Sequence, residues 1–333
     1  MTDKEKEFYS KPFKFSYSSL NKLLYSPSLF YKDYILNERE EKTEAYLIEG
    51  KVVHCLLFEP ENLNKKFNVS PSKTPTDNVR KVITKMVALC AESQLEITDI
   101  TDESEEFKKI ILDALISENL YQSLKEDSAR WAKIQTEENK AYWEFINNST
   151  LDVIDNDTLA KCQEKVDIIK ANESVMNLFT KKQSDFDLDP IQTYAEQPLE
   201  CKLKDLKFGL KGIIDFYQVD DDTKEVTICD LKTTSKTVTE FTETIDFYNY
   251  WLQAAIYCKL VYENLPEDKK EYQIIFKFVV IDKYNQVYVF DVSELTLSNW
   301  AESFEQVIER ANFHYTNNNY SLPFEFLTEK VIL

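Results

Sequence analysis

The chain has 333 residues, of which 43% are hydrophobic and 13% are aromatic. This length and composition suffice to bury a sizeable core, and they exclude an intrinsically disordered chain. The formal net charge of −19 argues against general adhesion to polyanions, although a local basic groove can lie on an acidic surface. Only three glycines and two histidines occur, which excludes a glycine-rich phosphate loop and a metal cage of several histidines.

Cysteine spacing and apolar runs exclude further classes of protein. The six cysteines are scattered and form no CxxC pair, so we expect reduced thiols and neither a zinc ribbon nor an iron–sulfur cluster. No apolar run reaches the length of a membrane span, and the first residues lack the apolar segment of a signal peptide. We therefore expect a cytoplasmic protein without membrane contact.

The first part of the chain has a helical pattern. Residues 16–35 contain serines suited to helix N-caps and an apolar stripe, with Pro27 as a break or a first-turn residue. A second helix is expected over 44–60, ending at Pro60, and a loop rich in Pro, Ser, Thr and Asn is expected over 68–78. Apolar residues then recur every three or four positions in four charged segments, at 79–93, 103–120, 137–148 and 156–179.

The hydrophobic period changes from the helical value to two near residue 192. Five strands are expected, at 193–205, 207–219, 225–234, 272–282 and 286–294. A helix is expected over 246–265, between the third and fourth strands, and a last one over 297–315. This order predicts a mixed α/β fold, in which helices flank a core sheet and a large helical insertion precedes it. We expect a single domain over 1–333, composed of N-terminal helices at 14–60, a helical elaboration at 75–182, and the sheet with its helices at 192–313.

The third strand carries charged side chains on one face. Asp230 and Lys232 alternate with apolar residues and share a face with Ile228. A hairpin turn near 222–223 pairs residues whose numbers sum to 445, which places Asp215 opposite Asp230. For a DxK pattern alone, a solvent-facing hairpin with a surface ion pair is the more frequent explanation.

Two facing carboxylates require a compensating positive charge. Side chains opposite one another in a hairpin are about 5 Å apart at their β-carbons, where two carboxylates repel by about 3 kcal/mol at an effective dielectric constant near 20. Lys232 offsets part of this repulsion, and a divalent cation offsets more. Carboxylate oxygens suit Mg²⁺, and a bound Mg²⁺ supports phosphodiester hydrolysis. Lys232 could orient or deprotonate the attacking water and offset developing negative charge.

Four motifs in order resemble the PD-(D/E)XK nuclease superfamily in its RecB-like form. "GIIDF" and "CDLK" resemble the core of a restriction-endonuclease-like sheet, "QAAIY" resembles the QxxxY motif, and "GKVVH" resembles the GxxxH motif. The segments "SYSSLNKLLYSPSLFY", "KAYWEFI" and "ANFHYTNNNYSLP" are similar to RecE-type, exodeoxyribonuclease VIII-like proteins of phages and prophages. Ser26–Pro27 stands where iron–sulfur members have a cysteine before proline, so the resemblance too implies no iron–sulfur cluster.

The resemblance assigns roles residue by residue. It implies catalytic roles for Asp215, Asp230 and Lys232, and metal ligands at His54, Asp215, Asp230 and the Leu231 backbone carbonyl. It implies substrate contacts for Gly50, Thr233, Gln253 and Tyr257, with Glu196 or Glu200 as a further acidic residue. A partly buried histidine is the alternative explanation for His54, and helix packing explains Tyr257 equally well.

The implied activity is Mg²⁺-dependent hydrolysis of DNA, with Mn²⁺ as the alternative ion. The resemblance favours a 5′ to 3′ double-strand exonuclease in phage-type recombination, with a ring-shaped homo-oligomer and a single-strand annealing protein as partners. An endonuclease or single-strand nuclease of the same fold remains open. So does a DNA-binding or virion-associated protein that retains the nuclease core without turnover.

Overall fold

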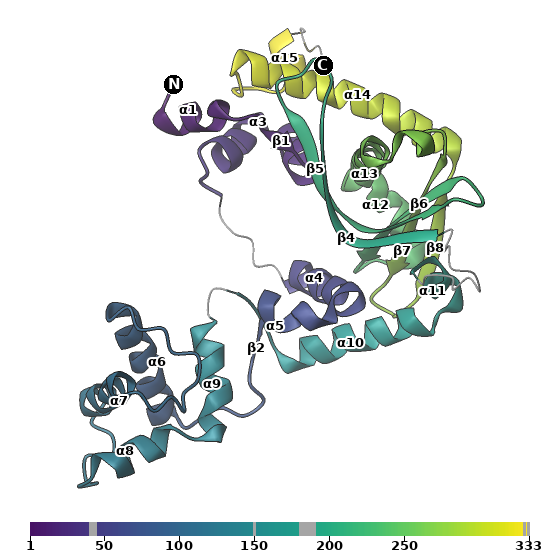
Figure 1. Cartoon of the computed structure of the whole chain (residues 1–333). Helices are drawn as coiled ribbons and strands as arrows, with labels where there is room; N and C mark the ends of the chain where they lie inside the picture. The colour runs from purple at the N-terminus through teal and green to yellow at the C-terminus, as the bar shows by residue number, and fades with distance from the viewer. Residues whose placement is uncertain (40–44, 149–150, 180–190, 329–330, 332–333) are drawn as a thin grey trace. The chain divides into compact units, whose positions relative to one another are not determined.

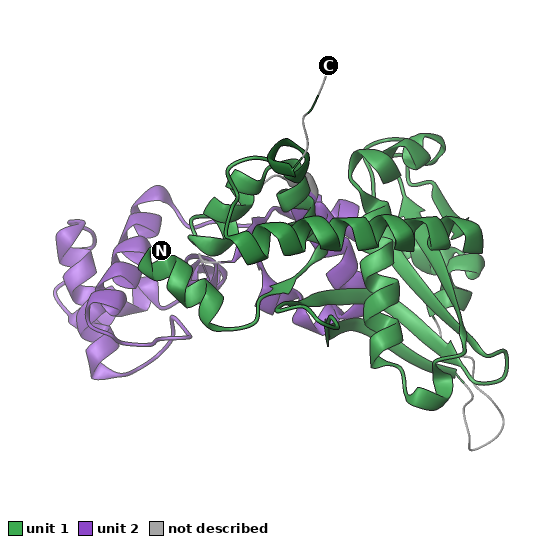
Figure 2. Ribbon diagram, turned by 90° about the horizontal axis from the view of Figure 1, so that it is seen from above, with its two compact units in different colours: residues 1–42, 165–333 green, residues 43–164 purple. Residues whose placement is uncertain are grey.

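The computed structural model describes residues 1–39, 45–148, 151–179, 191–328 and 331 (Figure 1). Contacts divide the chain into two compact units, one of residues 1–42 with 165–333 and the other of residues 43–164 (Figure 2). In sequence, the second unit is an insertion in the first. The expected ranges 14–60 and 75–182 include residues 40–44, 149–150 and 180–182, which lie outside the described residues.

The N-terminal segment of the first unit contains short helices with polar caps. Ser16 caps the helix predicted at the start of the chain, and Ser26 caps the next, where Pro27 occupies the first helical position. Of the two predicted roles, a break or a first-turn residue, Pro27 has the second, because its missing N–H is not needed at that position. The elements are α1 (Asp3–Ser10), β1 (Lys14–Phe15), α2 (Tyr17–Tyr25), α3 (Pro27–Phe30) and the π-helix η1 (Tyr31–Ile35).

The second unit is mainly helical, as expected. Phe107 and Trp143 are fully buried in an apolar cluster of this unit. The prediction of a loop over 68–78 is wrong for its first residues. Asn68 and Val69 form a parallel strand pair with Val153 and Ile154, which are distant in sequence. The elements are α4 (Ala45–Phe58), η2 (Pro60–Asn62), α5 (Leu63–Lys66), β2 (Phe67–Val69), α6 (Asp77–Glu92), α7 (Glu105–Ser117), α8 (Asp127–Ile134), α9 (Glu137–Asn147) and β3 (Asp152–Ile154).

All five expected strands are present in one mixed sheet of the first unit. They are β4 (Ile191–Lys202), β5 (Gly209–Asp220), β6 (Glu225–Thr233), β7 (Gln273–Ile281) and β8 (Val287–Val292). The sheet order is β1-β5-β6-β7-β8, with β4 paired to β5. β6 and β7 are parallel, and β7 and β8 are antiparallel. The predicted α/β class is confirmed; β1 has only two residues and escaped detection because so short a segment shows no period.

Helices cover this sheet on the side where the main core lies. The chain crosses from β6 to β7 through η3 (Val238–Glu240), α12 (Phe241–Phe247), α13 (Tyr250–Asn264) and η4 (Glu267–Lys269), and it ends with α14 (Glu294–Asn317) and α15 (Phe324–Thr328). In Figure 1, α13 lies between the sheet and α14, and apolar residues of both helices belong to the same buried cluster as those of the strands.

Two expected helices are each divided in the structure. The helix expected over 246–265 is broken at Asn249, which adopts a left-handed φ of 56°, a conformation that asparagine tolerates better than most residues. The segment 156–179 forms α10 (Asn156–Ala171) and α11 (Glu173–Phe179). Among the described residues, no helix combines the length and apolar character needed to cross a bilayer.

The register of the β5–β6 hairpin is the predicted one. The bonded pairs run from Asp220 opposite Glu225 to Phe216 opposite Cys229, and each pair sums to 445. Beyond Phe216, β5 stays paired with β4, whereas β6 stays paired with β7 as far as Thr233. The two strands of the hairpin therefore separate at Phe216, and residues beyond this point face an opening in the ladder.

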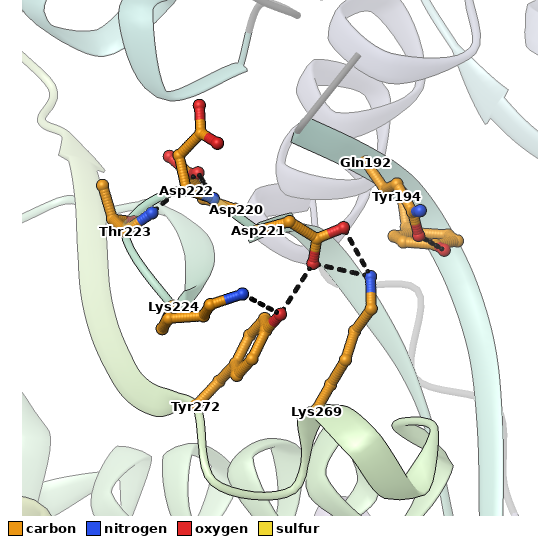
Figure 3. A network of polar contacts seen from close by, with 9 residues as sticks. All are labelled: Gln192, Tyr194, Asp220, Asp221, Asp222, Thr223, Lys224, Lys269 and Tyr272. Carbon is orange, nitrogen blue, oxygen red and sulfur yellow. Dashed lines mark hydrogen bonds and ion pairs between the residues drawn. The ribbon is translucent and has the colours of Figure 1, made fainter. Parts of the chain in front are cut away.

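The turn of this hairpin is held by a polar network (Figure 3). Lys269 Nζ lies 2.7 and 2.9 Å from the two carboxylate oxygens of Asp221. The Tyr272 hydroxyl donates to Asp221 at 3.0 Å and accepts from Lys224 Nζ at 3.1 Å. Asp220 accepts from the backbone N–H groups of the turn. These contacts anchor the turn to the segment that precedes β7, and so help to fix the register of the hairpin.

We expect Asp221→Asn to lower the free energy of unfolding by about 0.5–1 kcal/mol at neutral pH, because the pair is partly exposed. The Lys269 hydrogen bond holds the pKa of Asp221 below its ordinary value of 3.8, although burial opposes the shift. A lowered pKa stabilises the fold above that ordinary value, and the stabilisation disappears as the pH falls below it. Urea unfolding of both proteins at neutral and acid pH measures the difference.

Asp222 provides the matched control for this prediction. It enters the network through its backbone N–H, so Asp222→Asn is expected to leave stability unchanged. An Asp221→Asn protein as stable as the native chain at neutral pH would contradict the assigned role of the network.

Candidate active site

Two carboxylates lie where the hairpin strands separate. The register that ends at Phe216 and Cys229 places Asp215 across from Asp230, one position further on. Asp230 is fully buried, and Asp215 is 7% exposed. Asp215 Oδ2 accepts the backbone N–H of Leu231 at 2.8 Å. A side chain of β5 therefore takes over as the acceptor where the backbone ladder has ended.

The Asp230 carboxylate is held by two side chains. Lys232 Nζ lies 2.6 Å from Asp230 Oδ2, and Gln253 Nε2 donates to Asp230 Oδ1 at 3.0 Å. Lys232 also donates to Gln253 Oε1 at 2.9 Å, so the three side chains close a triangle of polar contacts. The predicted face of β6 thus carries an ion pair, and this pair is buried rather than exposed to solvent.

Helix α13 supplies the other wall of this cluster. Gln253 and Tyr257 lie one turn apart on one face of α13, and Gln253 Nε2 donates to the Tyr257 hydroxyl at 2.8 Å. Tyr250 belongs to the same face, and its ring centroid lies 4.7 Å from Lys232 Nζ. The sequence interpretation missed Tyr250. Its position three residues before Gln253 is the available signal, because residues i and i+3 of a helix share a face.

Burial and neighbouring charges determine the protonation of this cluster. Burial lowers the pKa of Lys232, but the negative charges of Asp230 and Asp215 outweigh it and raise the pKa above the ordinary value. Burial, with the same two charges, raises the pKa of Tyr257 well above its ordinary range. At neutral pH, Lys232 is therefore an ammonium ion and Tyr257 a neutral phenol.

The structure distinguishes the two glutamates that the sequence left as alternatives. Pairs on either side of Glu196 place it across from Asp215, and carboxylate oxygens of the two residues lie within 4.8 Å of one another. Glu196 has a φ of 45° inside a strand, a strained conformation for a residue other than glycine. Glu200 instead pairs with Lys14 at the surface. Glu196 therefore lies beside Asp215, and Glu200 does not.

The remaining predicted residues occupy several elements. Thr233 is the last residue of β6, and Leu231 is buried next to Asp230. Gly50 and His54 belong to α4 in the second unit, where the His54 ring lies 6.1 Å from that of Phe58. Ligation of a metal by His54 and by the Leu231 carbonyl stays a prediction. Substrate contacts of Gly50, Thr233, Gln253 and Tyr257 also stay predictions.

A cavity of about 610 Å³ lies beside the polar cluster. Tyr257 lines it together with the first residues of α2 and with parts of β4 and β5, including Leu199 and Gly212. A β-carbon at Gly212 would lie 3.0 Å from Leu260 Cδ1 and 3.4 Å from the Tyr257 ring. The missing side chain therefore allows α13 to approach β5 closely, which brings Tyr257 to the sheet.

Comparison with protein families decides the assignment of this site. The family model of the PD-(D/E)XK nuclease superfamily matches residues 14–321. The chain belongs to this superfamily. No curated protein matches the chain. A crystal structure from Eubacterium rectale, named "Putative exonuclease", aligns with 100% of this chain and 94% of its own at 12% sequence identity and a TM-score of 0.49. The assignment therefore rests on the family model.

The charge balance of this PD-(D/E)XK site fits a divalent cation. Carboxylate oxygens of Glu196 and Asp215 lie within 4.8 Å of one another, and Asp230 lies across from Asp215 where β5 and β6 separate. Lys232 is the ammonium group paired with Asp230. Two carboxylates within 4.8 Å of one another repel by about 3 kcal/mol or more at an effective dielectric constant near 20. Nucleases of this superfamily depend on divalent metals, and these carboxylate oxygens are the ligand type that such ions prefer.

We expect Gln253→Met to destabilise the fold by about 1–3 kcal/mol, because it leaves buried polar groups of Asp230 and Tyr257 without the amide that they share. Tyr257→Phe removes a single acceptor from that amide and is expected to cost about 1 kcal/mol. Urea unfolding in metal-free buffer measures both. Equal losses in the two variants would show that the amide does not join the two sides of the cluster.

Proposed function

We propose that this nuclease is a Mg²⁺-dependent deoxyribonuclease of the RecE type, which degrades double-stranded DNA from its ends in the 5′ to 3′ direction in the cytoplasm. The observation that carries the proposal is the convergence of Asp215, Asp230 and Lys232 where β5 and β6 separate. Buried carboxylates beside a protonated lysine suit hydrolysis of a phosphodiester, in which negative charge develops on the phosphate.

The metal-binding residues of this proposal are Asp215, Asp230 and Glu196, together with the Leu231 carbonyl and His54. A Mg²⁺ ion bound there would polarise a phosphoryl oxygen and lower the pKa of a bound water. Mn²⁺ accepts the same oxygen and imidazole ligands, so we expect it to substitute. The proposal includes no iron–sulfur cluster, because the cysteines are scattered along the sequence and form no CxxC pair.

Lys232 has the role of a hydrogen-bond donor in this proposal. Its Nζ lies 2.6 Å from Asp230 Oδ2, where it would orient the attacking water and offset the negative charge that develops on the phosphate. Gln253 accepts from Lys232 and donates to Tyr257, which holds the ammonium group toward Asp230. Thr233 and Gly50 are proposed to contact the DNA backbone. The RecE-type assignment extends the proposal to a ring-shaped homo-oligomer and a single-strand annealing protein as partner.

We expect the purified protein to degrade linear duplex DNA with Mg²⁺ and to leave covalently closed circular DNA intact, because an exonuclease requires an end. Lys232→Ala is expected to slow degradation by at least about 100-fold, the effect of losing one positioned hydrogen-bond donor to developing negative charge. Gel analysis of both substrates with end-labelled strands measures rate and polarity. Cleavage of the circle would indicate an endonuclease, and full activity of Lys232→Ala would overturn the mechanism.

A matched pair of variants tests the metal site separately from turnover. Glu196→Gln is expected to raise the Kd for Mn²⁺ by about tenfold, because one carboxylate beside Asp215 loses its charge. Glu200→Gln is the control and is expected to bind Mn²⁺ like the native chain, since Glu200 pairs with Lys14 instead. Calorimetric titration measures both. Absence of Mg²⁺ and Mn²⁺ binding by the native protein would favour a non-catalytic DNA-binding or virion-associated role.

A further inference from the structure

The bend between α12 and α13 presents two aromatic side chains to solvent. Phe247 is 76% exposed and Tyr248 is 46% exposed. Their ring centroids lie 4.8 Å apart, with the planes perpendicular. Single exposed apolar residues are common on protein surfaces, but two adjacent rings at a helix bend form a local apolar surface that needs an explanation.

The backbone of this bend is held firmly. The Tyr248 carbonyl accepts hydrogen bonds from the Tyr17 hydroxyl and from Asn21 Nδ2. Asn249 donates to Asn21 Oδ1 at 2.7 Å and accepts from Trp251 Nε1 at 3.1 Å. Side chains of α2 and α13 thus fix the bend from both sides. The exposed rings are presented on a rigid support, which reduces the entropy lost when a partner binds.

The aromatic surface is continuous with the candidate active site. The Tyr248 ring centroid lies 5.4 Å from that of Tyr250, at an interplanar angle of 32°. Tyr250 in turn has its ring centroid 4.7 Å from Lys232 Nζ. Three rings, from Phe247 through Tyr248 to Tyr250, therefore form a path from solvent to the lysine beside Asp230.

We propose that Phe247 and Tyr248 form a stacking surface for unpaired nucleobases of the DNA strand that enters or leaves the active site. This inference rests on the proposed function, because DNA is the occupant only if the protein acts on DNA. Aromatic rings stack on every base and so bind single strands without sequence preference. The chain carries a net charge of −19, so stacking supplies affinity for a polyanion that general electrostatic attraction does not.

Single-strand binding by the native chain and by Phe247→Ala tests the inference. A fluorescein-labelled oligonucleotide is titrated in metal-free buffer with chelator, so that no cleavage occurs, and fluorescence anisotropy gives the Kd. We expect Phe247→Ala to raise the Kd by about tenfold, the effect of losing one stacked base. Phe247→Tyr retains a ring and is expected to bind like the native chain. Phe326→Ala removes another exposed ring, on α15 and 57% exposed, and is the matched control.

Three further readouts separate stacking from other roles. The slope of log Kd against log salt should stay unchanged in Phe247→Ala, because no phosphate contact is lost. An abasic nucleotide at the stacked position, found by scanning along the strand, should weaken binding to the native chain but not to Phe247→Ala. Because Phe247 is exposed, the Phe247→Ala protein should have the same unfolding midpoint as the native chain.

The outcomes distinguish this inference from the proposed function. Equal DNA affinity of Phe247→Ala and the native chain, in a protein that degrades linear DNA with Mg²⁺, overturns the stacking surface alone. Failure of the native chain to bind or degrade DNA overturns the proposed function as well. A change of oligomeric state in Phe247→Ala with unchanged DNA affinity, measured by sedimentation, would assign the two rings to contact with a second copy of the chain.

Discussion

The separation of β5 from β6 at Phe216 is the constraint on which the site depends. Within the paired part of the hairpin, backbone groups satisfy one another, and side chains opposite each other pack or face solvent. Beyond it, the Leu231 N–H takes a carboxylate oxygen of Asp215 as its acceptor, while β6 remains in the sheet through its parallel pairing with β7. The carboxylates are therefore held by a rigid sheet at a place where the ladder is open to a ligand.

Burial of charge is the second feature that shapes this region. Asp230 is fully buried, and an isolated carboxylate in that position would be strongly destabilising. Lys232 forms an ion pair with one of its oxygens and Gln253 donates to the other. Gly212 lets α13, the helix that carries Gln253, approach β5 closely. The close approach of α13 to β5 therefore accompanies the contact between Gln253 and Asp230.

Helix α13 links this cluster to the surface. Its inner face holds Gln253 and Tyr257, and its first residue, Tyr250, lies next to Lys232. The left-handed Asn249 ends the preceding helix and starts this one, so the exposed ring of Tyr248 comes directly before the residues of the site. Helix α13 and the bend that precedes it therefore place groups at the sheet and groups in solvent close together in the chain.

Much of this protein could be read from local sequence pattern. The alternation of apolar and polar residues predicted the five long strands, and the position of the hairpin turn predicted that Asp215 lies across from Asp230. Both signals are properties of residues that are close in sequence. The choice of Glu196 over Glu200 needed the β4–β5 register, and the break at Asn249 needed contacts with Asn21 of α2. Tyr250 and the exposed rings of the bend gain meaning only from their distance to Lys232. These features depend on groups far apart in sequence, which tertiary packing alone brings together.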